Sequence, residues 1–501
     1  MTALATTAKI LVVGAGTMGS GIAQVAARAG HVVYLFDQDA AAVARGKASI
    51  AKYLDFLVAK GKLAAPEGVD ILARVLPIGR VEDARDAVLA IEAVAEKLDV
   101  KQALFAQIEA LLPTETILAT NTSSLSITAI AAALRRPQRL AGLHFFNPAP
   151  RMALVEIVSG LATDKAVADC LFDTARAWGK VAVHARSTPG FIVNRVARPY
   201  YGEALRALGE CAAAPETLDA ILHDACRFPM GPFELMDFIG HDVNFAVTRS
   251  VFDASFGDRR FLPSLIQQEL VLAGRLGRKS GRGFYDYGEQ ASRPEPATLA
   301  VSPTAATAIA VGDLGPAAAL LERLSDAGVA LERESGAGCL KVGAATLALT
   351  DGRTATLRAA AAGTPDLVLF DLALDYAATP RLAVAKADQC SDSAFAAAVG
   401  LLQAAGIAVS PIDDVAGMIA MRTVCMLANE AADAVMQGVA SAADIDAAMR
   451  HGANYPIGPL AWAGQLGYGT VVRALEHLLA HYGDDRYRIS PWLRRQLAAD
   501  R

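Results

Sequence analysis

The chain has 501 residues, which at roughly 150 residues per domain corresponds to about three or four domains. Lys and Arg number 47 against 52 Asp and Glu, and the formal net charge of −5 gives no overall basic field for nucleic acid or an anionic membrane surface. Hydrophobic residues make up 53% and charged residues 20%, which excludes a mainly disordered protein.

The N-terminus and the cysteines indicate the cellular compartment. The first nine residues lack the cationic start and apolar stretch of a signal peptide, and no run approaches the ~18 apolar residues of a membrane span. The six cysteines are scattered without a C-x-x-C pair, which is typical of a reduced environment and offers no metal site. We therefore expect a cytoplasmic protein with no membrane, nucleic-acid or metal partner.

The first predicted elements alternate between strand and helix. Residues 10–13 form an apolar strand, residues 22–29 an Ala-rich helix and residues 32–36 a second strand. Apolar runs recur at residues 87–94, 117–119 and 140–145, separated by helical stretches. Such alternation predicts a mostly parallel sheet covered on both faces, and we assign it to residues 1–188.

The remaining chain contains an internal repeat. Residues 189–290 are mainly helical, and residues 291–308 form a linker rich in Pro, Ala, Ser and Thr. Adding 227 to a position in the helical region reaches matching residues without a gap, as for Gly190 and Gly417 or for residues 229–232 and 456–459. We expect residues 309–412 to be a shortened, degenerate copy of the α/β domain and residues 413–501 a second, non-catalytic helical domain.

A glycine-rich turn follows the first strand and opens the first helix, with the sequence Gly14-Ala15-Gly16-Thr17-Met18-Gly19. In this pattern the first Gly permits a tight turn, the second lets the backbone approach a pyrophosphate, and the third lets the helix pack on the strand. Asp37 lies 23 residues after Gly14, at the spacing of a carboxylate on an adenosine ribose. The pattern predicts an α/β Rossmann-type domain that binds NAD rather than NADP.

Polar residues at strand ends predict a catalytic site. Ser123 and His144 follow or end strands, Glu156 sits in an apolar run, and Asn194 follows the turn at Gly190. A neutral His accepts a proton near pH 7, and a buried Glu beside it would fix its tautomer. Alternatively His144 is a hydrogen-bonded core residue, Ser123 a helix N-cap and Asn194 a helix-surface residue.

The first ~285 residues resemble the short-chain L-3-hydroxyacyl-CoA dehydrogenases. The likeness runs through the segments at residues 14–23, 120–125, 142–148, 188–195 and 229–234. It implies oxidation of (S)-3-hydroxyacyl-CoA to 3-oxoacyl-CoA, with His144 as base and Glu156 as its orienting carboxylate. It also implies that Ser123 and Asn194 contact the substrate and the His, and that the nicotinamide cofactor is contacted by Glu96, Lys101, Ser123 and Lys279.

The same resemblance points to coenzyme A at a basic helix. We expect one helix to carry Lys47, Lys52, Lys60 and Lys62, and the likeness places Tyr53 and Lys60 at CoA contacts. A solvated helix face is the alternative.

A closer likeness indicates the substrate. Residues 193–201 and 261–270 resemble segments of the bacterial phenylacetate-degradation dehydrogenases. It implies 3-hydroxyadipyl-CoA as substrate, while 3-hydroxybutyryl-CoA or general fatty-acid β-oxidation stays open. Arg227 stands where the family usually has Gly, and we hypothesise that it recognises the far carboxylate; the alternative is a surface Arg.

The second half departs from the family pattern. Asn194 maps to Met421, and we place the position of the missing His near residues 384–387, where the sequence is Val-Ala-Lys-Ala. The family's helical domain forms a dimer, so the second copy would imitate that interface within one chain, or the chain forms a homodimer. Two rival functions are a dehydrogenase with a Lys base, which would lack the His-Phe-Phe-Asn-Pro segment, and an NAD-binding structural or regulatory protein without turnover.

Overall fold

The computed structural model describes residues 2–303 and 305–500, and it divides into two compact units. The first unit comprises the chain up to Arg195 together with Gln437–Ala453. The second comprises Val196–Met436 and the chain from Asn454 onward. Within the described residues no helix is long and apolar enough to cross a membrane.

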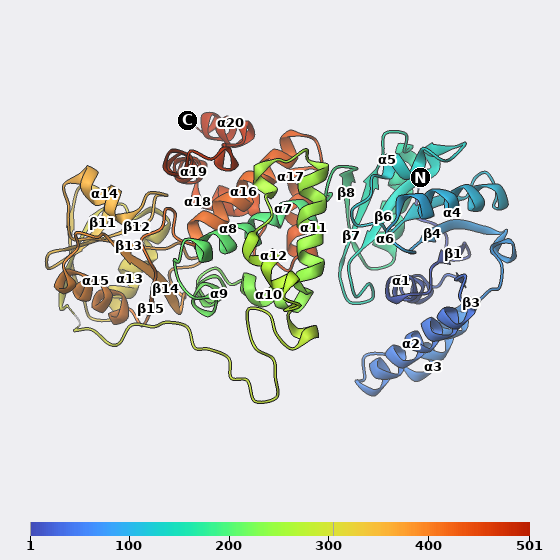
Figure 1. Ribbon diagram of the computed structural model, residues 1–501, viewed down its shortest axis with the longest axis horizontal. Coiled ribbons are helices and arrows are strands. Elements are labelled where there is room, and N and C mark those ends of the chain that lie inside the picture. Colours follow the sequence, from blue (N-terminus) through green and yellow to red (C-terminus); the bar gives the residue numbers. More distant parts are fainter. Residues whose placement is uncertain (1, 304, 501) are drawn as a thin grey trace. The chain divides into compact units, whose positions relative to one another are not determined.

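The first unit is built on one sheet with the strand order β3-β2-β1-β4-β5-β6-β7-β8 (Figure 1). In its described residues the neighbouring strands run parallel, apart from the antiparallel pair β6–β7. The strands are β1 (Lys9–Val13), β2 (Val33–Phe36), β3 (Val75–Pro77), β4 (Ala87–Glu92), β5 (Ile117–Thr120), β6 (Leu140–Phe145), β7 (Leu154–Ser159) and β8 (Val181–Arg186).

Apolar side chains on both faces of the strands explain why helices cover the sheet on both sides. In β1, Ile10 and Val12 pack in the cluster that contains Ile22 of the first helix, and the alternate residue Leu11 is also fully buried. The unit's helices are α1 (Thr17–Arg28), α2 (Ala40–Ala59), α3 (Ala65–Arg74), α4 (Leu98–Leu111), α5 (Ile127–Ala131), α6 (Lys165–Ala177) and α17 (Ala442–Gly452), with short 3₁₀ turns η1 (Val81–Ala84) and η2 (Pro137–Arg139).

One helix of the first unit comes from the far end of the chain. Helix α17 packs against β7 and β8, and the backbone N–H of Arg186 donates to the carbonyl of Val439 at 2.8 Å. A Cβ on Gly452 would lie 2.4 Å from a methyl carbon of Leu154, so the helix approaches β7 closely. Residues 437–453 therefore belong structurally to the first α/β unit, although the sequence assigns them to the second helical domain. The short helix α7 (Val193–Val196) spans the boundary between the units.

The second unit contains helices from both halves of the chain. Helix α16 is buried along nearly its whole length and packs against α8. The helices are α8 (Arg198–Gly209), α9 (Pro215–Asp224), α10 (Pro232–Ile239), α11 (His241–Ala254), α12 (Leu265–Leu272), α16 (Ala420–Met436), α18 (Pro459–Leu466), α19 (Tyr468–Tyr482) and α20 (Pro491–Ala499), with 3₁₀ turns η3 (Arg259–Phe261), η4 (Arg278–Ser280) and η6 (Asp485–Tyr487).

A second sheet in this unit has the order β10-β9-β11-β12-β13-β14-β15 and is mixed. Pairs β9–β10, β12–β13 and β14–β15 are parallel, whereas β9–β11, β11–β12 and β13–β14 are antiparallel. Its elements are β9 (Thr307–Gly312), η5 (Gly315–Ala317), α13 (Ala319–Asp326), β10 (Ala330–Glu334), β11 (Ala337–Val342), β12 (Ala345–Leu349), α14 (Ala355–Ala362), β13 (Leu367–Phe370), β14 (Arg381–Lys386), α15 (Asp392–Ala404) and β15 (Ala408–Pro411).

Element bounds in the two halves differ by the same 227 residues that relate the sequence motifs. Adding 227 to the bounds of β7 gives those of β14, and the same sum takes α6 to α15 and α10 to α18. The antiparallel pair β6–β7 has its counterpart in the antiparallel pair β13–β14. Within these matched elements, the offset pairs each residue of one half with a definite residue of the other.

Candidate active site

The glycine turn between β1 and α1 is shaped by close contacts at two of its three glycines. Gly14 has φ +104°, and a Cβ there would lie 2.4 Å from the carbonyl oxygen of Ala93. A Cβ on Gly19 would lie 1.8 Å from the carbonyl oxygen of Gly14. A Cβ on Gly16 would meet no atom within 4 Å. The second glycine thus faces open space at the N-terminus of α1, where a dinucleotide phosphate fits the free N–H groups of Thr17 and its neighbours.

Asp37 is fixed beside this turn by hydrogen bonds from the backbone. Its Oδ2 accepts from the N–H of Ala15 at 2.8 Å, and its Oδ1 accepts from the N–H of Asp39 at 3.0 Å. Asp37 also lines a cavity of about 600 Å³ with Lys47 and Gly79. A carboxylate at the edge of a cavity next to the glycine turn is the arrangement that holds an adenosine ribose, so the residues present fit NAD.

His144 and Glu156 form a buried pair on the antiparallel strands β6 and β7. They are direct partners in the register, and His144 Nδ1 lies 2.6 Å from Glu156 Oε2. The other oxygen of Glu156 accepts from the N–H groups of Ile192 and Val193 at 3.1 and 3.0 Å. Because an ionised carboxylate can only accept, this contact places a proton on Nδ1 and leaves Nε2 as the acceptor. The imidazole is held between this carboxylate and the ring of Phe146, with ring centroids 4.5 Å apart.

Ser123 is held in a separate polar network around Glu96. The Glu96 Oε1 atom accepts from the Ser123 N–H at 2.9 Å and from the Thr122 hydroxyl at 2.5 Å, and Oε2 lies 3.2 Å from Lys101 Nζ. Lys101 is buried and also donates to Glu92 at 2.6 Å. Burial opposes ionisation of Glu96, but the Thr122 hydroxyl, the Lys101 charge and the Ser123 N–H together hold its pKa below the usual value. The network fixes the turn that carries Ser123, while the N-cap of α5 is Ser126.

Asn194 and Lys279 lie in different surroundings. Asn194 is half-buried in α7, directly after the two N–H groups that Glu156 accepts. Lys279, in the second unit, forms an ion pair with Asp242 and is partly exposed. Their roles toward substrate and cofactor stay predictions.

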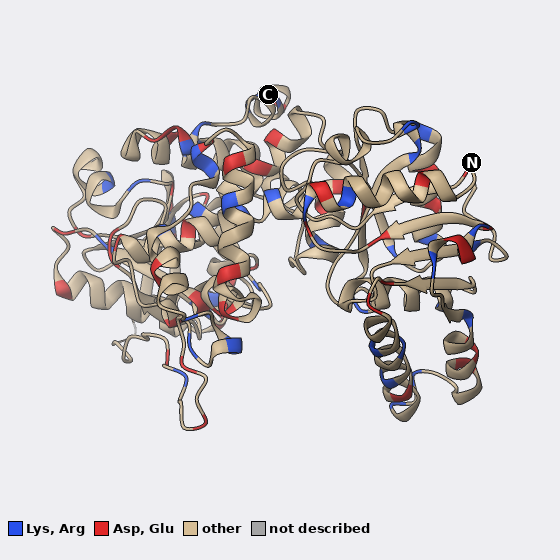
Figure 2. Cartoon of the chain, turned by 45° about the vertical axis from the view of Figure 1, so that its right-hand side comes forward, with Lys and Arg blue, Asp and Glu red and all other residues tan. Residues whose placement is uncertain are grey.

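Helix α2 carries basic residues along its length (Figure 2) and borders a cavity of about 370 Å³. The helix ends at Ala59, so the prediction that it carries Lys60 and Lys62 is wrong: Lys60 is the C-cap and Lys62 lies beyond. Tyr53 lines this cavity together with two arginines that the sequence analysis missed, Arg45 and Arg151. The signal for Arg45 was its helical spacing from Tyr53, eight residues apart on one face of α2. Arg151 is far from Tyr53 in the sequence and lines the same cavity only because of the tertiary fold.

Arg227 has a carboxylate partner. Its guanidinium lies 2.9 Å from Asp375 Oδ2, and both side chains are about half exposed. This ion pair favours the alternative of a surface arginine, because the guanidinium is already engaged.

The second half holds different residues where the first half has its His–Glu pair. At an offset of 227, Asp371 corresponds to His144 and Ala383 to Glu156, and the Asp371 N–H donates to the Ala383 carbonyl at 3.0 Å. The expectation that the missing His maps near residues 384–387 is therefore wrong, because those residues lie on and after β14, the counterpart of β7 rather than of β6. Asp371 accepts from the N–H groups of Ile419, Ala420 and Met421, so it binds the same turn that Glu156 binds in the first half.

Comparisons with known proteins identify the family. The model of the 3-hydroxyacyl-CoA dehydrogenase NAD-binding domain matches residues 9–188, and that of the C-terminal domain matches residues 190–287 and again 417–501. Residues 347–415 match the 3-hydroxybutyryl-CoA dehydrogenase reduced Rossmann-fold domain. The C-terminal domain is thus repeated within the chain, with a second Rossmann-like region before the second copy.

The first two of the following similar proteins cover nearly the whole chain, and the third covers just over half of it. The 3-hydroxyadipyl-CoA dehydrogenase of Escherichia coli K12 is 48% identical over 489 residues, covering 97% of each chain. A crystal structure described as 3-hydroxybutyryl-CoA dehydrogenase from the same species has 47% identity and a TM-score of 0.90, with 98% of both chains covered. A probable 3-hydroxybutyryl-CoA dehydrogenase of Bacillus subtilis is 42% identical, covering 57% of this chain and 99% of its own. The chain belongs to the NAD-dependent 3-hydroxyacyl-CoA dehydrogenase family.

Proposed function

We propose that the chain oxidises (S)-3-hydroxyacyl-CoA to 3-oxoacyl-CoA at one site in its first half, with His144 as the base. The observation that carries this proposal is the buried 2.6 Å contact between His144 Nδ1 and Glu156, because it leaves Nε2 free to accept a proton. Bound NAD supplies the acceptor for the hydride that leaves C3.

The protein's own residues hold the substrate and move the proton. Nε2 of His144 accepts the proton of the 3-hydroxyl, and Glu156 stabilises the imidazolium that results. Ser123 and Asn194 hold the oxygen while it becomes a carbonyl. Glu96 acts through Ser123, because it accepts the Ser123 N–H and so fixes its turn. Burial of His144 and Glu156 strengthens these interactions by excluding water.

Among the possible substrates, we favour 3-hydroxyadipyl-CoA. Support comes from the Escherichia coli relative of that name, which matches along the whole chain. The crystal structure that carries the 3-hydroxybutyryl-CoA name keeps the shorter substrate as the second candidate. We also propose that the protein is cytoplasmic and acts in phenylacetate breakdown, on the likeness of residues 193–201 and 261–270 to that group of enzymes.

A panel assay tests this function. NADH formation is followed by absorbance with 3-hydroxyacyl-CoA esters that differ in chain length and in the presence of a terminal carboxylate. We expect turnover with several esters and the highest kcat/KM with 3-hydroxyadipyl-CoA. A protein that binds NAD but oxidises none of the esters would be the structural or regulatory alternative. The highest kcat/KM with 3-hydroxybutyryl-CoA would favour the second candidate.

We propose that coenzyme A binds along α2. Tyr53 lines the 370 Å³ cavity there, and Arg45 and Arg151 add positive charge for phosphate groups. Lys60, at the end of the helix, has its Nζ 5.9 Å from the centroid of the Phe56 ring and is exposed to solvent. We propose that this exposed lysine meets a phosphate at the helix end.

We further propose that the second half is a degenerate duplicate without catalysis, with domains at residues 1–188, 189–290, 309–412 and 413–501 joined by a linker at 291–308. The constant offset of 227 supports the duplication. Asp371, Ala383 and Met421 occupy the positions of His144, Glu156 and Asn194. This set lacks a base with an orienting carboxylate.

The two helical copies are proposed to form an intrachain pseudo-dimer. Glu203 accepts from Arg486 at 3.0 Å and from the Tyr487 hydroxyl at 2.9 Å. Its counterpart at an offset of 227, Glu430, accepts from Arg260 at 3.2 Å, and Arg260 is the counterpart of Tyr487. Reciprocal contacts of this kind are typical of an interface with two-fold symmetry. We expect light scattering to give the mass of one chain, and a stable dimer would favour the homodimer instead.

A further inference from the structure

The helical part of the second unit contains a small cavity that is rich in arginine. Its volume is about 110 Å³, several times the space of one water molecule. The arginines that line it are Arg198, Arg206, Arg260 and Arg486. All of the lining residues belong to the second unit, so that unit alone forms the cavity. The cavities beside the glycine turn and beside α2 are lined by other residues.

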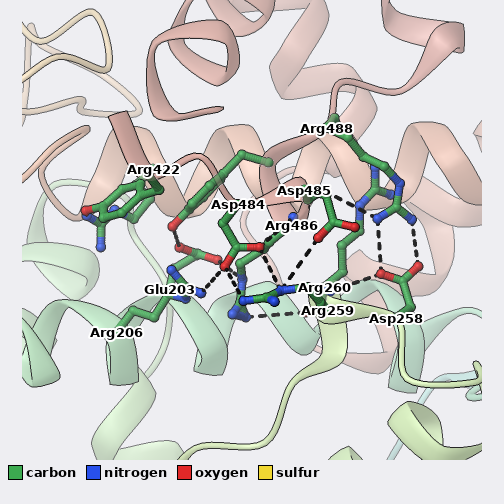
Figure 3. Close-up of polar contacts among 12 residues, drawn as sticks. Glu203, Arg206, Asp258, Arg259, Arg260, Arg422, Asp484, Asp485, Arg486 and Arg488 are labelled. Carbon is green, nitrogen blue, oxygen red and sulfur yellow. Dashed lines mark hydrogen bonds and ion pairs between the residues drawn. The ribbon is translucent and has the colours of Figure 1, made fainter. Parts of the chain in front are cut away.

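Three of the four arginines are paired with carboxylates of the same unit. The pairs are Arg206 with Asp484, Arg486 with Glu203, and Arg260 with both Glu430 and Asp433. Figure 3 shows this network of arginines and acids, which joins α8 and η3 of the first half of the chain to α16 and η6 of the second half. The protein itself therefore balances the charge of these three arginines.

Arg198 differs, because no carboxylate among the described residues of the second unit lies within ion-pair distance of it. The residue is only 6% exposed, and its Nη1 donates to the neutral hydroxyl of Thr248 at 3.0 Å. Its guanidinium carbon lies 4.8 Å from the centroid of the Tyr201 ring. Burial lowers the pKa of Arg198, and the nearby phenols of Tyr201 and Tyr455 oppose this effect. A buried cation without an anion is costly, so an anion bound in the cavity would stabilise the folded unit.

Two buried hydrogen-bond donors at this cavity also lack an acceptor. The Nε atoms of Arg198 and Arg260 are both buried, and neither has a hydrogen-bond partner among the described residues. Buried polar groups are normally hydrogen-bonded, so two unsatisfied donors on residues that line one cavity indicate a missing acceptor. An oxyanion supplies both what Arg198 lacks and what the two Nε atoms lack, because it carries a negative charge on several acceptor oxygens.

We propose that this cavity binds a small, singly charged oxyanion, with Arg198 as the residue that holds it. The guanidinium donates to the oxygens of the anion while Thr248 keeps Nη1 in place, and Tyr201 covers one face of the guanidinium. The volume of the cavity suits a short carboxylate or dihydrogen phosphate and is too small for NAD or coenzyme A. The lining comes from α8, α11 and η3 of the first half and η6 of the second half, so the bound anion stabilises the contact between the two helical copies.

The test measures the melting temperature of the full-length protein in sodium acetate, in sodium phosphate and in sodium chloride at equal ionic strength. NAD and coenzyme A are present in excess, so that their own phosphate sites are filled. We expect acetate, phosphate or both to raise the melting temperature about 2–4 °C above the chloride value and to reach a plateau at millimolar concentration. The plateau distinguishes binding from general stabilisation by salt, which keeps growing with concentration. A rise with acetate alone identifies a carboxylate ligand, and a rise with phosphate alone identifies an inorganic one. No rise above chloride with either anion overturns the proposal.

Variants of Arg198 locate the site. We expect Arg198→Met to abolish the rise, and to fold, because an apolar side chain of similar size commonly replaces a buried charge without loss of stability. Arg198→Lys keeps the charge without the planar fork and should retain part of the rise. Arg249→Met, which removes an exposed arginine on the same helix as Thr248, is the matched control and should show the full rise. The full rise in Arg198→Met overturns the proposal.

The melting temperature does not depend on turnover, so this inference and the proposed function fail separately. A rise that requires Arg198 in a protein that oxidises no 3-hydroxyacyl-CoA supports the anion site and contradicts the proposed function alone. Normal turnover in a protein that shows no rise above chloride overturns the anion site alone.

Discussion

Replacement of Glu156 by Gln is the sharpest test of the catalytic pair, because its two carboxylate oxygens have different partners. Oε1 accepts from the N–H groups of Ile192 and Val193, whereas Oε2 has His144 as its only hydrogen-bond partner among the described residues. A Gln side chain can keep its oxygen on the two N–H groups and present its NH₂ to Nδ1. His144 must then accept at Nδ1 and carry its proton on Nε2, which leaves no acceptor for the substrate hydroxyl.

The expected fall in kcat follows from this change of tautomer. We expect kcat to fall by about 10²–10⁴, the range of general acid–base catalysis and of carboxylate-to-amide changes behind a catalytic His. The free energy of unfolding should fall by less than about 2 kcal/mol, because the N–H groups of α7 keep their acceptor. NADH formation with 3-hydroxyadipyl-CoA gives kcat, and titration calorimetry gives the NAD affinity, which should stay at the wild-type value.

The second half supplies the matched control. Asp371→Asn changes the corresponding buried carboxylate that binds Ile419, Ala420 and Met421. Because each Asp371 oxygen accepts from backbone N–H groups, the amide leaves donors unpaired, and we expect a loss of about 1–3 kcal/mol in stability with kcat unchanged. Wild-type turnover in Glu156→Gln, or an equal loss of kcat in Asp371→Asn, would show that Glu156 does not orient the catalytic base.

Three further predictions concern the cofactor turn, the CoA cavity and pH. Gly16→Val should weaken NAD binding at least about tenfold in calorimetry while costing no more than about 1 kcal/mol of stability, since a Cβ there meets no protein atom. Arg45→Gln and Arg151→Gln should raise KM for the acyl-CoA and leave kcat unchanged, and a normal KM in both would count against this cavity. Burial opposes ionisation of Asp484, but the Arg486 N–H and the side chains of Arg206 and Arg259 lower the pKa of Asp484 to about 2. The ionised carboxylate therefore contributes to the free energy of unfolding above pH ~4, and this contribution is lost as the pH falls through about 2. Asp484→Asn should therefore cost about 1–2 kcal/mol at pH 7 after allowance for solvent screening, and only about a few tenths of a kcal/mol near pH 2, where the folded-state carboxyl is half protonated; urea unfolding that shows the same cost at both pH values would contradict this.

Local patterns were sufficient to predict the glycine turn and five of the eight strands described in the first sheet, but they missed β3, β7 and β8. The strand at residues 140–145 is confirmed to the residue as β6, and the run at 10–13 lies within β1. The glycine spacing predicted the turn because the need for glycine there is mostly local. A Cβ on Gly19 would meet the carbonyl oxygen of Gly14 within the turn, and a Cβ on Gly14 would meet the carbonyl oxygen of Ala93 just after β4. The pairing of His144 with Glu156 was also within reach, since both stand in short apolar runs close together in the sequence.

Features that depend on distant residues were not predictable in the same way. The role of Asp371 requires the register of β13 with β14, because only that register shows that it replaces His144. The burial of Arg198 was not predictable either, because its hydrogen-bond partner Thr248 lies 50 residues away in the sequence. The packing of α17 on β7 and β8 joins segments that are more than 250 residues apart in the sequence.

We propose that one site, with His144 as its base, carries all the activity of the chain. The most direct measurement is NADH formation from 3-hydroxyadipyl-CoA by wild-type protein and by His144→Ala, with NAD binding measured in parallel. This role of His144 predicts turnover in the wild type, a loss of at least about 10² in kcat for His144→Ala, and the same NAD affinity in both. Near-normal turnover in His144→Ala would contradict it, because the base would then lie elsewhere in the chain.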